Sequence, residues 1–159
     1  RAFNAGTFRV VRFTGKQTFY RAAGWDSDGK LASPYGSWWA HQTVLQQIGR
    51  KIENFRGWLP DDYLNAAWPA QYRGATALCE DCNDMSEMCQ LVLPEGAVIE
   101  GLVGEAAPQP QTSDLDRSDP KTPMFQGGYE QVFFRRGTIN PLWVYTVDPW
   151  PRRSRPGPL

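Results

Sequence analysis

This chain of 159 residues has one histidine, three cysteines and a formal net charge of zero. His41 is the only histidine, which weakens any scheme in which an imidazole activates a serine or cysteine nucleophile. The 17 basic residues are balanced by 17 acidic ones, so we expect no strong electrostatic attraction to nucleic acid. A metal-dependent nuclease is disfavoured as well, because the sequence has neither a His/Asp cluster nor a basic stripe. No apolar run approaches the ~20 residues that cross a bilayer, so we expect no membrane contact.

The composition predicts one packed domain. Hydrophobic residues make up 41% of the chain and aromatic residues 13%, which is enough apolar surface to build a core. The length fits a single domain of ~100–150 residues, which we place at 1–150, and we expect the Pro- and Arg-rich tail at 151–159 to be disordered. The first residues show no signal pattern and no initiator Met, so we expect a piece cut from a longer polypeptide.

Residue patterns predict short strands with one or two helices, an α+β fold. Aromatic and β-branched residues at 8–13 and 17–21 flank Gly15, which predicts a β-hairpin with a tight turn. Apolar residues at three- and four-residue steps predict an amphipathic helix over roughly 40–55, and a second, shorter helix should open at Pro60. Further strands are expected at 90–93, 97–103, 131–134 and 142–147, with a long polar loop at 107–124.

The cysteines Cys79, Cys82 and Cys89 are clustered in one acidic segment. They could supply three soft ligands to zinc, with His41 or a nearby carboxylate as the fourth. The alternative to a zinc site, which we favour, is a solvated loop with reduced thiols or one local disulfide, and no metal. A disulfide framework is disfavoured by the odd count and by the clustering.

Two segments in the first half carry groups suited to an anionic ligand with a flat ring. Arg21 ends a predicted strand before a turn, where its guanidinium could hold a phosphate with two hydrogen bonds or could simply lie on the surface. Trp38 and Trp39, after Gly36 and Ser37, offer flat faces on which a nicotinamide or adenine could stack. The alternative for this aromatic pair is core packing at the entry to a helix.

A third segment combines two glycines with two polar side chains. Gly127 and Gly128 allow a ligand or the backbone to approach closely, and Glu130 and Gln131 follow at the mouth of a strand. A carboxylate or carboxamide there could hydrogen-bond ribose hydroxyls and stabilise a cationic sugar transition state. The alternative is a tight turn followed by a half-exposed strand.

Taken in order, these segments resemble a known toxin family. The residues that carry the resemblance are Tyr20-Arg21, Gly36-Ser37-Trp38-Trp39-Ala40, Leu93–Ile99, Val103–Pro108 and Phe125–Gln131. They are similar to the C-terminal toxin domains of bacterial polymorphic and Rhs-type effectors, in particular the NAD-consuming group typified by the tuberculosis necrotizing toxin. In that family a strand arginine, an aromatic turn, a "GxAAP" segment and a glycine-rich segment ending in glutamine surround an NAD cleft.

The resemblance implies a compact ADP-ribosyltransferase-like fold in which antiparallel strands and one or two helices enclose an NAD cleft. It implies an NAD(P)+ glycohydrolase that cleaves the nicotinamide–ribose bond of its substrate without a metal. Its implied catalytic residues are Arg21, Glu130 and Gln131. Its implied substrate-binding residues are Tyr20, Ser37, Trp38, Trp39, Phe125, Gly127 and Gly128.

This chain departs from the family pattern in ways that leave the chemistry open. The "GxAAP" and glycine-rich segments are separated by the loop 109–124, and Glu130 precedes Gln131. A strand glutamate is typical of ADP-ribosyltransferases, which would modify a protein or nucleic-acid acceptor, whereas the necrotizing-type hydrolases rely on the glutamine. A third alternative, from another class, is a non-catalytic module that binds carbohydrate or peptide.

The resemblance also implies a biological setting. The domain would be secreted or delivered as part of a larger effector, act in the cytosol of a target cell and deplete its NAD. A small cognate immunity protein would block the cleft.

Overall fold

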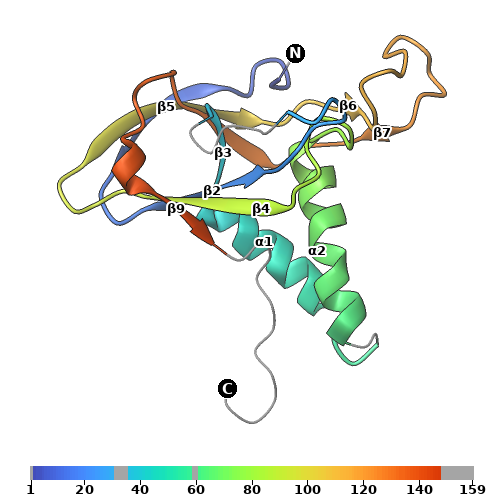
Figure 1. Cartoon of the computed structure of the whole chain (residues 1–159), viewed down its shortest axis with the longest axis horizontal. Helices are drawn as coiled ribbons and strands as arrows, with labels where there is room; N and C mark the ends of the chain where they lie inside the picture. The colour runs from blue at the N-terminus through green and yellow to red at the C-terminus, as the bar shows by residue number, and fades with distance from the viewer. Residues whose placement is uncertain (1, 31–35, 59–60, 148–159) are drawn as a thin grey trace.

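The protein is an α+β fold of two helices and a curled, half-barrel antiparallel sheet, seen here in a computed structural model (Figure 1). The structure describes residues 2–30, 36–58 and 61–147; for residues 61–66 and 147 it describes the backbone alone. The strands are β1 Arg9–Thr14, β2 Thr18–Ala23, β3 Trp38–His41, β4 Glu87–Val92, β5 Val98–Glu105, β6 Gln109–Pro110, β7 Met124–Phe125, β8 Glu130–Phe133 and β9 Val144–Val147. The helices are α1 Gln42–Glu53 and α2 Asp61–Thr76, with a 3-10 turn at Pro141–Trp143.

Seven strands form the main sheet in the order β1-β5-β8-β3-β2-β4-β9, and every neighbouring pair is antiparallel. The curl brings aromatic side chains from distant strands into one core, where Phe13, Phe19 and Phe134 meet edge to face. A second core lies between the sheet and the helices, in which Ile48 of α1 and Trp68 of α2 are buried. The sheet is therefore packed on both of its faces.

The strands expected at 8–13 and 17–21 both form, but the prediction that they pair as a hairpin is wrong. β1 pairs with β5, and β2 pairs with β3 and β4. The turn between β1 and β2 instead binds the turn after β4: Lys16 N donates to Leu93 O at 2.7 Å and Leu93 N donates to Gln17 O at 3.0 Å. Gly15 is needed for close approach, since a Cβ there would lie 2.4 Å from the carbonyl oxygen of Pro94. The positive φ of the turn falls on Lys16.

The helix predicted over 40–55 is confirmed as α1. His41 caps it by accepting a hydrogen bond from Thr43 N through Nδ1 at 3.2 Å. The second helix is longer than predicted, because α2 continues through Pro69 to Thr76. Proline removes one backbone donor from a helix interior, but the buried side chains of Trp68 and Tyr72, on either side of Pro69, pack α2 into the second core.

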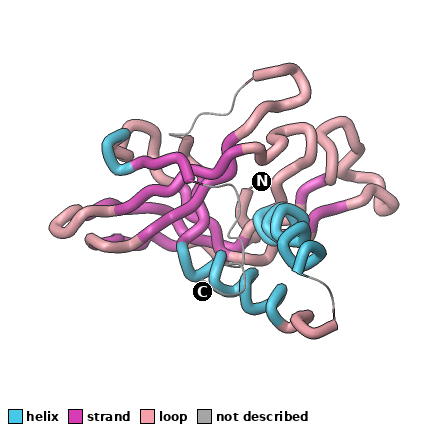
Figure 2. The backbone as a smooth tube through the Cα atoms, turned by 60° about the horizontal axis from the view of Figure 1, so that its bottom comes forward, coloured by secondary structure: helices cyan, strands magenta, loops and turns pink. Residues whose placement is uncertain are grey.

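In the second half of the chain, strands form at each predicted place, with bounds shifted by a few residues. The polar loop at 107–124 is closed at its base by the short β6–β7 ladder, which stands apart from the main sheet (Figure 2). The tail at 151–159, predicted to be disordered, lies outside the described residues. Among the described helices, none is long and apolar enough to cross a membrane.

The cap on α1 predicts that stability depends on pH through His41. Burial lowers the pKa of this imidazole, opposed by the charge of Glu130. Because the folded-state pKa lies below the unfolded value of ~6.5, the stability from neutral His41 is present above that pH and is lost as the pH falls below it. We expect urea unfolding to show lower stability at pH ~5.5 than at pH ~7.5. His41→Asn, which retains a capping side chain, should lose less over the same interval; an equal loss would contradict this assignment.

Candidate functional site

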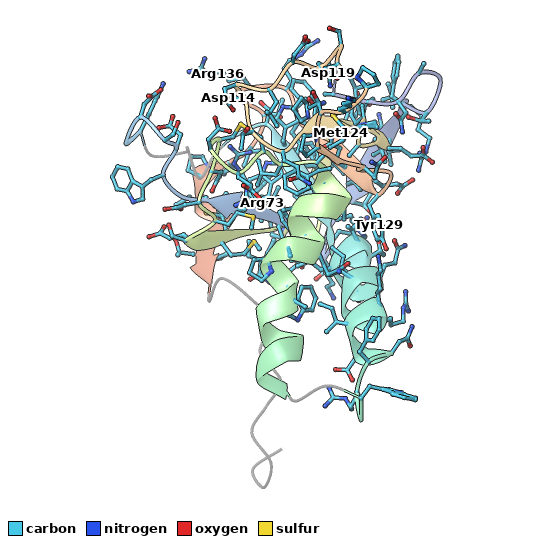
Figure 3. All side chains as sticks on the ribbon, turned by 90° about the vertical axis from the view of Figure 1, so that its right-hand side faces the viewer. Arg73, Asp114, Asp119, Met124, Tyr129 and Arg136 are labelled. Atoms are coloured by element: carbon cyan, nitrogen blue, oxygen red, sulfur yellow. A yellow bond between two sulfur atoms is a disulfide. The ribbon has the colours of Figure 1, made fainter. Side chains whose placement is uncertain are left out.

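A cleft of about 610 Å³ lies between the curled sheet, the C-terminal end of α2 and the long loop. Its volume is within the range of ~300–1,000 Å³ that is typical of small-molecule sites. Figure 3 views this side of the molecule, with Arg73 near the upper part of α2 and with Asp114 and Asp119 on the loop above it. The sheet contributes Arg21, Trp38, Trp39 and Gln131 to the lining, so the structure brings together predicted residues from all three sequence segments.

Arg21 lies within β2, just after the last residue that pairs with β3; the prediction that it ends the strand is wrong, because β2 continues to Ala23 along β4. Its Nη1 donates to the carbonyl oxygen of Trp38 at 3.1 Å. The guanidinium also lies against Gly36, where an added Cβ would be only 2.3 Å from the Arg21 Cζ. Glycine at this position therefore leaves the space that the arginine head occupies, which explains why a turn glycine precedes the aromatic pair.

The surroundings of Arg21 make its charge costly. Burial lowers the pKa of the Arg21 guanidinium, while Tyr72 and Cys89 act in the opposite direction. Burial also raises the pKa of the Tyr72 phenol to about 12 and raises the pKa of the Cys89 thiol, so both are uncharged at neutral pH. An anion bound in the cleft would interact favourably with the Arg21 guanidinium.

Of the two tryptophans, Trp38 is the one that can face a ligand. It lines the cleft and is partly exposed, with its ring packed against Phe3 and Phe133. Trp39 also reaches the cleft wall, but it is only 2% exposed and its Nε1 donates to Gly36 O at 2.7 Å. Trp39 is thus mainly a core residue, and the packing alternative holds for that half of the pair.

Gln131 and Glu130 lie on opposite sides of β8, because successive strand residues point to opposite faces. Gln131 lines the cleft, and its Nε2 donates to the carbonyl oxygen of Ala2 at 2.9 Å. Glu130 is exposed in a different hollow, where it pairs with Arg9 at 2.9 Å. The expectation that both side chains act on one ribose is therefore corrected: only Gln131 reaches the cleft.

Five other predicted binding residues lie outside this cleft. The hydroxyl of Tyr20 accepts a hydrogen bond from Gln90 Nε2 at 3.0 Å, and its ring packs on the helix side of the sheet. The other four line smaller hollows elsewhere on the surface: Ser37, Phe125, Gly127 and Gly128. Gly127 shows why glycine is needed there, since its φ is +66° and a Cβ would lie 2.3 Å from Ala106 O. These glycines set the entry to β8.

The wall opposite the sheet includes a disulfide, which was one of the alternatives that the sequence allowed for the three cysteines. Cys79 and Cys82 are bonded and both line the cleft, with Cα atoms 5.3 Å apart, whereas Cys89 is buried with a free thiol. Asp81 and the two bonded sulfurs lie close together, but their bond leaves no thiolate for a metal, and Asp81 accepts a hydrogen bond from Ser113 N at 2.8 Å. The local disulfide is the alternative that the structure supports.

Sequence reasoning missed the arginine that holds this wall in place. Arg73, in the last turn of α2, donates through Nη1 to Leu78 O at 3.2 Å and Cys79 O at 2.7 Å, and through Nη2 to Asn83 O at 2.9 Å. A cation near a helix C-terminus is a recognised signal, but nothing in the local sequence shows that the following loop folds back onto it. Asn83, which is 4% exposed, ties the same loop to β2 by donating to Ala22 O.

The charged side chains in the described lining of the cleft are basic. Its described lining contains two arginines, Arg21 and Arg117, and neither an aspartate nor a glutamate. A low-dielectric cleft with charge of one sign concentrates ligands of the other sign. The cleft can therefore bind an anion and place a flat ring beside Trp38. The carboxamide of Gln131 can form a hydrogen bond with another polar group of the same ligand.

Comparisons with protein-family models, with curated proteins and with solved structures find no match to this chain.

The contact between Gly36 and Arg21 can be tested by adding one methyl group. Gly36→Ala should displace the guanidinium, and because the head of a flexible side chain can move aside, the fold should lose no more than about 1 kcal/mol of stability. Gly74→Ala is a matched control, because its new Cβ would meet nothing within 4 Å and alanine favours the helix by about 0.5–1 kcal/mol. Urea unfolding measures both changes. A loss of about 3 kcal/mol or more in Gly36→Ala would contradict this packing, because it would mean that the new Cβ meets a neighbour that cannot move aside.

Proposed function

We propose that the protein is an NAD(P)+ glycohydrolase that binds its substrate in this cleft. The observation that carries the proposal is the convergence of Arg21, Trp38 and Gln131 in one positive cleft whose described lining holds no carboxylate. These three residues come from segments that the sequence resemblance singled out independently. A dinucleotide matches the cleft chemically, because it combines a diphosphate, a flat cationic ring and ribose hydroxyls.

In this proposal Arg21 binds the diphosphate, and Trp38 packs against the nicotinamide. The reaction breaks the bond between the nicotinamide nitrogen and ribose C1′, and the bonding electrons leave with nicotinamide. Water adds at C1′ and releases a proton, so that NAD+ and water give nicotinamide, ADP-ribose and H+. An oxocarbenium-like transition state needs positioning and electrostatic stabilisation more than a strong acid or base, which suits a chain with one histidine.

Gln131 would orient the attacking water. Its Nε2 donates to Ala2 O, and a carbonyl can only accept, so the amide orientation is fixed. The Oε1 atom has no hydrogen-bond partner within the part of the chain that the structure describes. That oxygen can accept a hydrogen bond from a ribose hydroxyl or from water.

The position of Glu130 favours hydrolysis over ADP-ribosyl transfer. A transferase of the kind considered from the sequence would use a strand glutamate to activate its acceptor. Here that glutamate pairs with Arg9 outside the cleft, while the glutamine next to it lines the cleft. Transfer to a macromolecule therefore stands as the second candidate, and the setting of a delivered toxin with an immunity protein stays a prediction from the resemblance.

The test is NAD+ consumption by the purified protein, with nicotinamide and ADP-ribose separated by chromatography. We expect release of both products without an acceptor, and a loss of about 100-fold or more in kcat for Gln131→Ala. Glu130→Gln is the matched control on the neighbouring residue and should retain wild-type turnover.

Three outcomes would contradict the proposal. Loss of activity in Glu130→Gln but not in Gln131→Ala would place the chemistry at the other face of β8. ADP-ribose label on a macromolecule after lysate is added, without free product, would establish the transferase. An absence of both turnover and label would leave a binding module for carbohydrate or peptide as the better account.

A further inference from the structure

We propose that Arg117, on the long loop, is a second phosphate-binding residue of the cleft, acting opposite Arg21. This inference rests on the proposed function for the ligand class, a nucleotide that carries a diphosphate. The loop departs from the family pattern, and no residue of it was among the predicted site residues. Arg117 is exposed and lines the cleft together with Gln109 from the base of the same loop.

The hydrogen bonds of Arg117 leave most of its donors available. A single nitrogen, Nη2, donates to Pro108 O at 2.8 Å and to Gln109 Oε1 at 2.7 Å. A guanidinium has five N–H donors, and those on Nη1 and Nε have no partner among the residues that the structure describes. The ion pairs found in the described part of the chain do not include Arg117. The loop therefore holds one edge of the fork and leaves the other edge for a ligand.

The loop is fastened at several points, so that Arg117 is not carried on a free arm. Gln111 N donates to Pro123 O at 3.0 Å across the base of the loop, and Glu80 N donates to Gln111 O at 2.8 Å. Ser113 bonds to Asp81 next to the disulfide. Because these contacts already order the loop, a ligand that binds Arg117 would have less conformational entropy to remove.

No carboxylate forms an ion pair with Arg117 in the part of the chain that the structure describes. The acidic neighbours in the loop are engaged in local turns: Asp114 accepts from Thr112 Oγ1 at 2.6 Å, and Asp116 accepts from Ser118 N at 2.9 Å. Neither aspartate lines the cleft. Arg21 contributes a positive charge from the sheet and Arg117 contributes one from the loop. Both guanidinium groups line the same cleft, and each can donate a pair of hydrogen bonds to a phosphate.

The test is calorimetric binding of ADP to the whole chain, which does not depend on turnover. We expect Arg117→Gln to bind ADP about 10- to 100-fold more weakly than wild type, the effect of losing hydrogen bonds to a charged group. Lys121→Gln is the matched control, since it removes the same charge from an exposed position of the same loop outside the cleft. Arg117→Lys should recover part of the affinity, because it restores the charge without the planar fork.

The dependence of ADP affinity on salt separates ligand binding from a merely structural role. Loss of a charge that contacts phosphate should make this dependence shallower in Arg117→Gln. If Arg117 only supported the structure of the loop, the same charges would still contact the phosphate and the dependence would be unchanged. Wild-type affinity in Arg117→Gln, an equal loss in Lys121→Gln, or no binding of ADP to the wild-type protein would each overturn the inference. If Arg117→Gln weakens ADP binding but the wild-type protein does not cleave NAD+, the phosphate site stands and the proposed function fails.

Discussion

The close contact between the Arg21 guanidinium and the backbone at Gly36 fixes where a positive charge lies in the cleft. β2 and β3 pair only at Phe19↔His41 and Tyr20↔Ala40, so the two strands separate where Arg21 begins. The arginine head fills the resulting gap and donates to Trp38 O. One side chain thus closes the sheet at this point and also supplies one of the two positive charges in the described lining of the cleft.

This arrangement places a binding group where stability alone would not favour it. Burial opposes the charge of Arg21, and the neighbouring Tyr72 and Cys89 are neutral at physiological pH. An apolar residue would fill the same gap at a lower desolvation cost. The opposite wall is held as firmly, by the three carbonyl contacts of Arg73 and by the disulfide between Cys79 and Cys82. Both walls are therefore ordered before a ligand arrives, which favours affinity.

Local patterns in the sequence predicted the elements better than their partners. The period of apolar residues was enough to place α1, and alternation with turn residues was enough to place the strands. The pairing of β1 with β5 was not predictable, because Gly15 is read locally as a hairpin turn whereas its structural role is contact with Pro94, far along the chain. The extension of α2 beyond Pro69 likewise depends on tertiary packing.

In the candidate site, too, the residue types were predictable from the sequence but their arrangement in space was not. Residue chemistry and the family resemblance singled out Arg21, Trp38 and Gln131, which the fold brings together. The assignment between Glu130 and Gln131 needed the facing of β8, which the sequence alone does not fix. Arg117 gave no local signal, because it lies in a polar loop whose approach to the cleft is set by contacts with the segment around the disulfide.

We propose that the phosphates of the ligand bind at Arg21, and a crystal structure of the protein with bound ADP-ribose tests this most directly. The diphosphate should lie within hydrogen-bond distance of the Arg21 guanidinium, with the ribose that has lost nicotinamide toward Gln131. A diphosphate bound at Arg9 on the far side of β8, or a cleft left empty while ADP-ribose binds elsewhere, would contradict the central claim.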